Sequence, residues 1–410
     1  MNMEPMPMIE WEKALDIQGG TQPPRSEFIN HPQNGYIRLI QIRDFDSDKH
    51  KVYVPFTNKL KTCQKEDIFI ARYGASTGRI LTGLQGAYNV ALAKIIKKDK
   101  KIDNKFLYYF LQSYIFQNYL KRVSSRSAQS GFNKNDLASV AVPKPSFLEQ
   151  QKIASILSSV DEAIEKTQAI VKQTRKVRKG IIRELLNEGI DNTKFKDTPV
   201  GNIPISWSYK KLSEVTEIIN GGTPSRSNNE YWENGNIPWA TPTDITKQKS
   251  KYIKKTNSYI NNQGLDNSSA TLLPIGAVLM TSRATIGERS INTVPMATNQ
   301  GFKSFICKND ELLNEFLYYL IEILKDRFKS LSSGSTFLEI SKSEMESFLI
   351  QVPPIEEQKE ICKRISSLDT KIQIEQQQIQ KLSKIKNGLM QQLLTGKVRV
   401  PLNENEEVPQ

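Results

Sequence analysis

The stretch LEQQKIASILSSVD at residues 148–161 returns, with changes, as EEQKEICKRISSLD at residues 356–369. A shift of 208 residues places the whole segment 145–189 on 353–397 without a gap, and thirteen of the forty-five paired positions are identical. A match of this length at one fixed offset indicates an internal duplication.

The duplication extends beyond this segment. The tripeptide GGT occurs at 19–21 and again at 221–223, and NKFLYYFL (104–111) is close to NEFLYYLI (314–321). The offsets vary, as they do when surface loops gain or lose residues. We therefore predict two copies of one globular domain, each followed by a long helix.

Each predicted helix has apolar residues at spacings of three and four, which is typical of a coiled-coil seam. Pro145 and Pro353 suit the helix starts, and Gly189 and Gly396 suit the ends. The predicted seam consists of Ile153, Leu157, Val160, Ile164, Val171, Val177, Ile181, Leu185, Ile361, Ile365, Leu368, Ile372, Ile379, Ile385, Leu389 and Leu393.

Each helix would contain roughly forty residues and extend about 60 Å. An isolated helix of this kind leaves its apolar stripe in water, so we expect the two helices to pack together, antiparallel. The alternative is two separate helices, each packed on its own domain.

The expected fold class is α+β, with two globular mixed α/β domains separated by two long antiparallel helices that form a coiled coil with an internal pseudo-twofold repeat. Short apolar runs such as IRLIQI (37–42) predict strands, and FLYYFLQSYIFQNYL (106–120) predicts an amphipathic helix. The predicted boundaries are domain 1 at 1–144, helix 1 at 145–189, a linker at 190–206, domain 2 at 207–352, helix 2 at 353–396 and a tail at 397–410.

The charge balance favours an anionic partner. Lys and Arg number 57 against 44 Asp and Glu, which leaves a formal charge of +13. Nucleic acid is the first partner to consider, and solubility alone is the alternative. The three scattered cysteines, the lack of signal-peptide features and the lack of a long apolar segment lead us to expect a cytoplasmic protein.

Common catalytic motifs are missing from the sequence. It contains neither G-x-x-x-x-G-K-[ST] nor G-x-G-x-x-G, and its cysteines and histidines have no metal spacing. The string GASTG (74–78) matches a nucleophile elbow around Ser76, but that fold needs a histidine after the serine and none follows His50. We therefore expect no catalytic residue and no metal site.

Four segments together resemble the specificity subunit of type I restriction–modification enzymes, over essentially the whole chain. They are PSFLEQQKIASILSSVDEAI (145–164), INGGTPSRSNNEYWENGNIPWATPTDI (219–245), PPIEEQKEICKRISSLDTKI (353–372) and GLMQQLLTGKVRV (388–400). The first copy departs from this pattern, because it has GGTQPPRSE where the second has GGTPSRSNNEYW.

The resemblance implies a non-catalytic subunit whose globular parts are target recognition domains. Each would read one half of an asymmetric, bipartite site in double-stranded DNA, and the helices would set the spacing between the halves. The resemblance also implies two methyltransferase subunits bound to the helices and two restriction (motor-nuclease) subunits in the full complex. The partners, and not this chain, would bind S-adenosylmethionine, ATP and magnesium.

Phosphate contacts are expected from Lys and Arg, and base readout from polar loop side chains. For each of these positions a solvated loop residue is the alternative. The predicted DNA-binding residues are Thr21, Arg25, Arg72, Ser76, Arg126, Gln129, Asn133 and Lys134 in the first copy and Thr223, Ser225, Arg226, Ser227, Arg283, Ser335, Thr336 and Lys342 in the second.

If the inward stripes of the helices pair, their outer faces remain for the methyltransferase subunits. Candidates for that contact are Gln150, Lys152, Asp161, Glu162, Glu165, Gln358, Lys359, Asp369 and Lys371, with plain solubility as the alternative. Two other functions stay open: a coiled-coil scaffold that binds no DNA, and the specificity subunit of a methylation-only system without a nuclease.

Overall fold

The structure, a computed structural model, describes residues 5–124, 131–248, 250–331 and 339–401. The chain forms two compact units, of which the first is made from two stretches of sequence and the second from one. The first unit combines Met1–Ala169 with Gln376–Gln410, and the second is Ile170–Glu375. Both long helices, α5 (Phe147–Asn187) and α11 (Ile355–Leu393), contribute one part to each unit.

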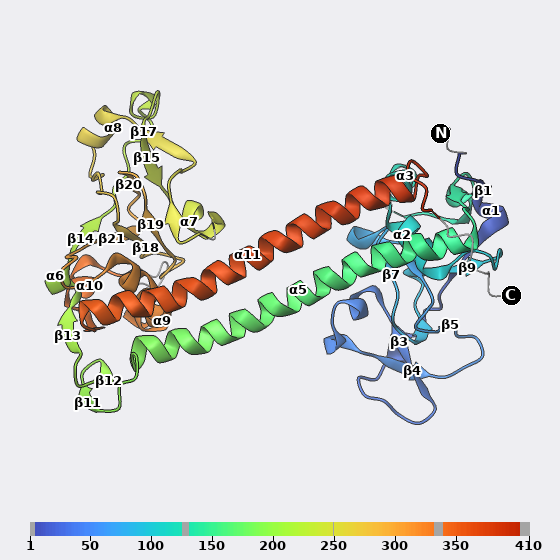
Figure 1. The fold of residues 1–410 in the computed structure, drawn as a ribbon, viewed down its shortest axis with the longest axis horizontal. Helices are drawn as coiled ribbons and strands as arrows, with labels where there is room; N and C mark the ends of the chain where they lie inside the picture. The colour runs from blue at the N-terminus through green and yellow to red at the C-terminus, as the bar shows by residue number, and fades with distance from the viewer. Residues whose placement is uncertain (1–4, 125–130, 249, 332–338, 402–410) are drawn as a thin grey trace. The chain divides into compact units, whose positions relative to one another are not determined.

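The first unit contains two four-stranded sheets and one strand pair (Figure 1). One sheet has the order β2 (Leu15–Gly19), β9 (Leu92–Lys97), β6 (Phe69–Ala71) and β7 (Ile80–Leu81). The other has the order β4 (Tyr53–Pro55), β3 (Tyr36–Ile40), β8 (Gly86–Tyr88) and β5 (Thr62–Cys63). The pair joins β1 (Met8–Glu10) to β10 (Ala141–Pro143).

Short helices complete this unit. The α-helices are α1 (Trp11–Ala14), α2 (Asn104–Gln112), α3 (Tyr114–Ser124) and α4 (Lys134–Leu137), and the 3₁₀ turns are η1 (Arg25–Glu27), η2 (Ile42–Phe45), η3 (Asp48–His50) and η4 (Gly74–Ser76). The Asp103 side chain caps α2 by accepting a hydrogen bond from the backbone of Phe106, at 2.8 Å. The apolar face of α2 and α3 packs against the β2–β9–β6–β7 sheet, and Trp11 stacks on Phe116 in the same core.

The second unit has a related strand arrangement, with sheets of five and three strands. Its largest sheet has the order β14 (Thr216–Asn220), β21 (Phe302–Cys307), β18 (Val278–Thr281), β19 (Arg289–Asn292) and β16 (Tyr252–Ile253). A second sheet has the order β17 (Ser258–Ile260), β15 (Ile237–Ala240) and β20 (Ala297–Thr298). The strand pair joins β13 (Ser208–Lys211) to β22 (Leu349–Val352). Its helices are α6 (Leu212–Val215), η5 (Asn229–Tyr231), α7 (Pro242–Gln248), α8 (Asn262–Asp266), α9 (Asn314–Leu331) and α10 (Lys342–Ser347).

Strand registers show that the two units repeat one topology. The parallel pair β3–β8 sets Leu39 opposite Ala87, and the parallel pair β15–β20 sets Trp239 opposite Ala297. The antiparallel pairs β2–β9 and β14–β21 likewise correspond, as do β1–β10 and β13–β22. The predicted duplication of an α+β domain is therefore confirmed.

The two long helices run antiparallel within each unit. In the first unit, Ile153 and Leu157 near the start of α5 pack with Met390 and Leu393 near the end of α11. In the second, Ile182 and Leu186 near the end of α5 share a core with residues near the start of α11, including Ile361 and Ile365. The predicted antiparallel pairing is confirmed.

The seam between the helices differs in part from the prediction. Val177 and Ile385, at equivalent places in the repeat, are 41% and 51% exposed, so their assignment to the seam is wrong. A regular alternation of three and four after Val171 leads to Thr174 and then Arg178, and Thr174 is buried. The heptad positions after Val171 are therefore occupied by polar residues. A pattern based on apolar residues alone selects Val177, which is next to Arg178.

A carboxylate near the start of each helix holds the segment that follows the other helix. Glu149 accepts hydrogen bonds from Arg399, at 2.8 and 2.7 Å. Glu357 accepts from the backbone of Ile190 at 3.0 Å and from Trp207 Nε1 at 2.9 Å. The predicted linker 190–206 also contains a hairpin, β11 (Phe195–Thr198) with β12 (Gly201–Pro204). Within the described residues, no helix is both long and apolar enough to cross a membrane.

Candidate nucleic-acid interface

A glycine turn after β2 and after β14 lets the chain cross the neighbouring sheet. A Cβ on Gly20 would lie 2.2 Å from the carbonyl oxygen of Asn89, and one on Gly221 would lie 1.8 Å from that of Asn299. No larger residue fits at such distances. Gly20 is therefore the structural partner of Gly221, one residue away from the register in which the two GGT triplets align.

The loop after this turn in the second unit holds Arg226 on two tryptophans. The Arg226 guanidinium lies 3.7 Å from the centre of the Trp232 ring and 5.0 Å from that of Trp239. Both rings are fixed, because their Nε1 atoms donate to the carbonyl oxygens of Ser225 (3.0 Å) and Gly222 (2.9 Å). Among the residues that the structure describes, Arg226 has no carboxylate partner, so its charge is positioned but uncompensated.

Hydroxyl groups surround this arginine along the chain. The Ser225 and Ser227 Oγ atoms lie 2.8 Å apart, and Thr223 forms a hydrogen bond to Gln300. Ser225, Arg226 and Ser227 are exposed. An exposed guanidinium beside hydroxyl donors can bind a phosphate or a base edge.

The other predicted residues of this unit are less available. Arg283 lies 3.8 Å from Glu339, which also lies 3.8 Å from Lys303. Burial lowers the pKa of Lys303. Lys342 pairs with Glu346 at 3.6 Å within α10. Ser335 and Thr336 lie outside the described residues.

In the first unit the equivalent loop lacks the tryptophan platform. Thr21 Oγ1 donates to the carbonyl oxygen of Lys59 at 3.3 Å, and Arg25 is exposed in η1. Arg72 follows β6, and its guanidinium lies 5.0 Å from the centre of the Tyr73 ring. The Arg72 Nε atom is buried without a hydrogen-bond partner.

The remaining predicted residues of the first unit lie on two nearby segments. Ser76 is partly exposed in η4. Asn133 caps α4 by accepting hydrogen bonds from its backbone, and Lys134 donates to Asp16 at 2.6 Å. A Cβ on Gly131 would lie 3.0 Å from the Tyr73 ring, so the segment before α4 lies against the Arg72 loop. Arg126 and Gln129 lie outside the described residues.

Two predicted partner-binding residues are instead internal. Gln150 is fully buried, accepts from the backbone of Asp103 (2.8 Å) and donates to the carbonyl oxygens of Lys101 (3.1 Å) and Pro145 (3.0 Å). Their assignment to an outer face is wrong, because each side chain is fully buried and its amide forms three hydrogen bonds to backbone groups. Gln358 repeats the same three contacts, with Leu313, Glu311 and Pro353.

Asp161 and Asp369 also face inward. Asp161 accepts from Tyr109 at 2.9 Å and from Lys386 at 2.8 Å. Asp369 accepts from Tyr319 at 2.9 Å and from Arg178 at 2.5 Å. The carboxylates join a domain to both helices but remain 28% and 37% exposed, so their role in binding a partner stays a prediction. The exposed candidates are Glu162, Glu165, Lys359 and Lys371, while Lys152 is partly exposed.

Sequence reasoning missed several functional candidates. The predicted DNA-binding residues do not include Trp232 and Trp239, although an arginine six residues before a tryptophan in a loop is a usable signal. The exposed Val177 and Ile385 were placed in the seam. A basic cavity in the first unit, which includes Arg43 and His50, had no sequence signal beyond scattered charge.

Comparison with known proteins agrees with this geometry. The family described as "Type I restriction modification DNA specificity domain" matches residues 13–173 and again residues 204–384. The chain belongs to this family. The two matches each include one sheet system and most of one long helix, as the repeated topology requires.

Two relatives come from Methanocaldococcus jannaschii. The type I restriction enzyme MjaIX specificity subunit is 38% identical over 195 residues, which cover 47% of this chain and 45% of that protein, so that match spans about half of the relative's length. The MjaVIII specificity subunit is 27% identical over 380 residues, which cover 89% of this chain and 86% of that protein.

Two solved structures share the fold. A chain from a study of complex assembly and conformational transition of the type I R-M system has a TM-score of 0.64 at 16% identity, covering 97% of this chain and 99% of that one. The type I restriction-modification system S subunit from M. genitalium has a TM-score of 0.56 at 16% identity, covering 96% and 98%. At this identity the likeness concerns the fold alone.

Proposed function

We propose that this specificity-family chain reads a bipartite, asymmetric target in double-stranded DNA, one half with each unit. The observation that supports this proposal is that the two units share one topology but differ in their loops. The Arg226 platform of the second unit has no counterpart in the first, where the corresponding loop holds Thr21 and Arg25. Equal frameworks with unequal contact residues would read unequal sequences.

The long helices would fix the spacing between the two half-sites. They are continuous over 41 and 39 residues, and each unit contains an antiparallel pairing of the two. Helix length is therefore a geometric variable separate from the reading loops. A matched insertion of one helical turn in both helices should change the spacer of the target and leave both half-site sequences unchanged.

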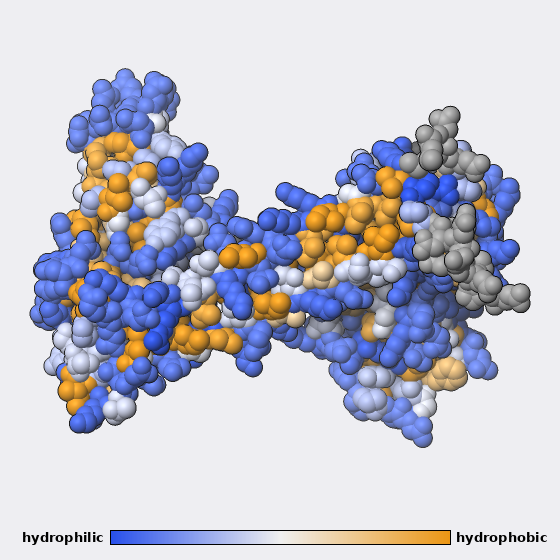
Figure 2. All heavy atoms as spheres, viewed as in Figure 1, coloured by the Kyte–Doolittle hydropathy of each residue, from blue (hydrophilic) through white to orange (hydrophobic). Residues whose placement is uncertain are grey.

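The same helices would dock the methyltransferase subunits. Val177 and Ile385 are exposed at equivalent positions of the repeat, and Figure 2 shows apolar side chains gathered over the last part of α11. Two equivalent apolar contacts would recruit two copies of one partner. The proposed partners would supply S-adenosylmethionine, ATP and magnesium chemistry. Within the described residues no group of three His, Cys, Asp or Glu side chains could hold a metal ion.

Mapping methylated bases across a host genome, with and without this gene, tests the proposal directly. We expect methylation at one asymmetric bipartite sequence, which disappears when the gene is removed. Unchanged methylation, or no salt-sensitive DNA binding by the assembled complex, would favour a scaffold that binds no DNA.

The docking contact needs its own test. Val177→Asp together with Ile385→Asp should reduce co-purification of the methyltransferase subunits, because charge replaces exposed apolar surface. Lys172→Asp and Lys384→Asp, on exposed positions of the same helices, provide a control. Full co-purification with the first pair would rule out this surface.

A further inference from the structure

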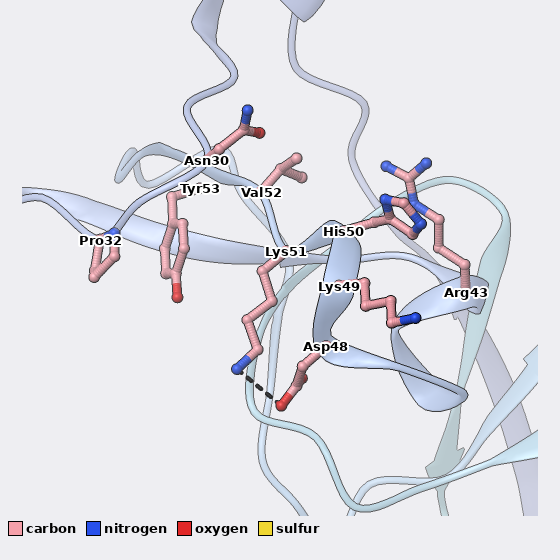
Figure 3. A pocket seen from close by; sticks show the side chains of 9 residues that line it. All are labelled: Asn30, Pro32, Arg43, Asp48, Lys49, His50, Lys51, Val52 and Tyr53. Carbon is pink, nitrogen blue, oxygen red and sulfur yellow. Dashed lines mark ion pairs between the residues drawn. The ribbon is translucent and has the colours of Figure 1, made fainter. Parts of the chain in front are cut away.

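The first unit contains a cavity of about 440 Å³ whose lining includes three Lys or Arg side chains and one Asp (Figure 3). Its residues are Asn30, Pro32, Arg43, Asp48, Lys49, His50, Lys51, Val52 and Tyr53. Three segments converge on it: the chain near Asn30, the turn η2, and η3 with the start of β4. Backbone hydrogen bonds between Ile29 and Tyr53, at 3.0 and 2.8 Å, bring the first segment to the last.

The single acid of this cavity is already compensated. Asp48 lies 2.9 Å from Lys51 and 3.1 Å from Arg38, and the Lys51 hydrogen bond lowers the pKa of Asp48. Arg43, Lys49 and His50 are exposed, and none of them forms an ion pair in the part of the chain that the structure describes. Figure 3 shows the side chains of Arg43 and His50 beside each other. The cavity therefore carries uncompensated positive charge.

Local structure fixes the two turns that carry Arg43 and Lys49. Ser47 caps η3 by accepting a hydrogen bond from the backbone of Lys49, at 3.2 Å. Asp44 holds η2, because its Oδ2 atom accepts from the backbone of Gln41 at 2.7 Å. The cluster is thus mounted on two capped turns, one carrying Arg43 and the other carrying Lys49 and His50.

The second unit keeps the turn but carries a different set of charged residues around it. Asp244 accepts from the backbone of Thr241 at 2.8 Å, as Asp44 does from Gln41, so the two turns correspond. By that correspondence Thr243 replaces Arg43. A separate cavity in the second unit, beside η5 and α8, is lined by Glu230, Glu233, Asn234, Asn236, Asn261, Asn262 and Gln263. The arginine at this turn is therefore specific to the first unit, although Lys247 and Lys251 follow the corresponding turn in the second.

We propose that this cavity binds a backbone phosphate of DNA next to the half-site that the first unit reads. The inference rests on the proposed function. A small anion on exposed cations competes with water and salt and gains little. A polyanion gains from the release of its counterions and keeps its neighbouring phosphates within reach of the rest of the unit. The Arg43 fork and the Lys49 ammonium suit phosphate oxygens.

The test uses a double variant that carries both Arg43→Gln and Lys49→Gln. It is compared with the unaltered chain, and both chains are assembled with methyltransferase subunits. Affinity for a duplex with the mapped target and for a duplex without it is measured over a range of salt. The double substitution should weaken both to a similar degree and reduce the salt slope by about one. The methylated sequence should stay the same, since phosphate contacts carry no base information.

A second double substitution, Lys65→Gln with Lys100→Gln, removes equal charge from exposed positions outside the cavity. An unchanged slope in the Arg43 and Lys49 variant, or an equal loss in this control, would overturn the proposal. Titration with inorganic phosphate separates the two sources of the ligand. Variant-sensitive binding of phosphate with no change in DNA binding would make the cavity a small-anion site and would also overturn the proposal.

Failure of the proposed function gives a different result. In that case the unaltered complex itself shows no preference between the two duplexes. Urea unfolding of the variants is measured in parallel, and its midpoint should not change, because the substituted side chains are exposed.

Discussion

Lys386 Nζ lies 2.7 Å from Asp161 Oδ1, and this contact joins the two long helices inside the first unit. The second unit repeats it with Arg178 and Asp369, at the positions that the duplication relates to Lys386 and Asp161. A tyrosine of the adjoining domain donates to each carboxylate, Tyr109 in one unit and Tyr319 in the other. In each unit, therefore, one polar cluster joins both long helices to the adjoining domain.

Lys386→Glu should lower the stability of the first unit. The substitution places two carboxylates together in a half-buried site and removes a charged hydrogen bond, at a cost of about 2 kcal/mol. Urea unfolding measures the change. Asp161→Lys in the same chain should recover part of it, whereas Lys384→Glu, at an exposed position of α11, should have little effect. Equal effects of Lys386→Glu and Lys384→Glu would contradict a specific linkage.

The second unit adds a charge network that gives it a distinct acid response. Glu322 lies 2.7 Å from Arg178 and 2.6 Å from Arg289. Burial alone would raise the pKa of Glu322, but the two arginines outweigh it and the pKa is below its usual value of 4.5. Glu322 therefore contributes stability above the unfolded-state pKa, and that contribution is lost as the pH falls through the lower folded-state value.

Glu322→Gln should accordingly destabilise the protein at pH 7, and the difference from the unaltered chain should shrink as the pH falls below about 4. Urea unfolding at pH 7, 5 and 3.5 measures this. Asp326→Asn, on an almost fully exposed side chain of the same helix, is the control and should show little change. A difference that stays constant with pH would mean that packing, and not charge, explains the loss.

The sequence predicted the architecture well, because duplication and helical periodicity are local signals. It predicted the detail of the helix seam less well. The residue next to Val177 that faces the other long helix is Arg178. It forms ion pairs with Glu322 and Asp369, which are remote in sequence. A pattern of apolar residues cannot show that a charged residue will form an ion pair between the two helices.

The prediction that Gln150 and Gln358 bind a partner on an outer helix face is wrong for a related reason. Gln150 and Gln358 are polar residues in the first turns of helices, and such residues usually face water. The structure buries them because backbone groups of another segment, such as the amide of Asp103, need partners there. That need arises from tertiary structure alone. The Arg226 platform depends in the same way on two tryptophans that a loop fold brings together.

Gln150→Ala should destabilise the first unit by about 2 kcal/mol, because it removes the hydrogen-bond partner of one backbone amide and two carbonyl groups at a buried or partly buried site. Gln151→Ala, at the exposed neighbouring position, should change stability by less than about 0.5 kcal/mol. Thermal unfolding of both variants measures the difference. If Gln150→Ala proved as harmless as Gln151→Ala, the burial described here would be incorrect.

Arg226→Gln should weaken DNA binding by the assembled complex more than it weakens the fold. The stacked guanidinium contributes about 0.5–1 kcal/mol to stability at an exposed site, so the unfolding midpoint should move little. Arg226→Lys keeps the charge but not the planar fork, and it should restore only part of the affinity. Unaltered affinity with a large fall in the unfolding midpoint would show that Arg226 acts only on the structure of its loop.

Glycines in the helices and in the crossing turn should respond to alanine in opposite directions. Gly180 and Gly388 occupy equivalent exposed positions of α5 and α11, and a Cβ there meets nothing within 4 Å. Gly180→Ala and Gly388→Ala should each raise the unfolding free energy by about 0.5–1 kcal/mol, since alanine favours the helix.

Gly221→Ala should lower the unfolding free energy strongly, because its Cβ would overlap the carbonyl oxygen of Asn299 at 1.8 Å. Urea unfolding compares the three variants with the unaltered chain. A loss of stability from Gly180→Ala or Gly388→Ala would mean that the helix needs glycine at that position, for example for a bend.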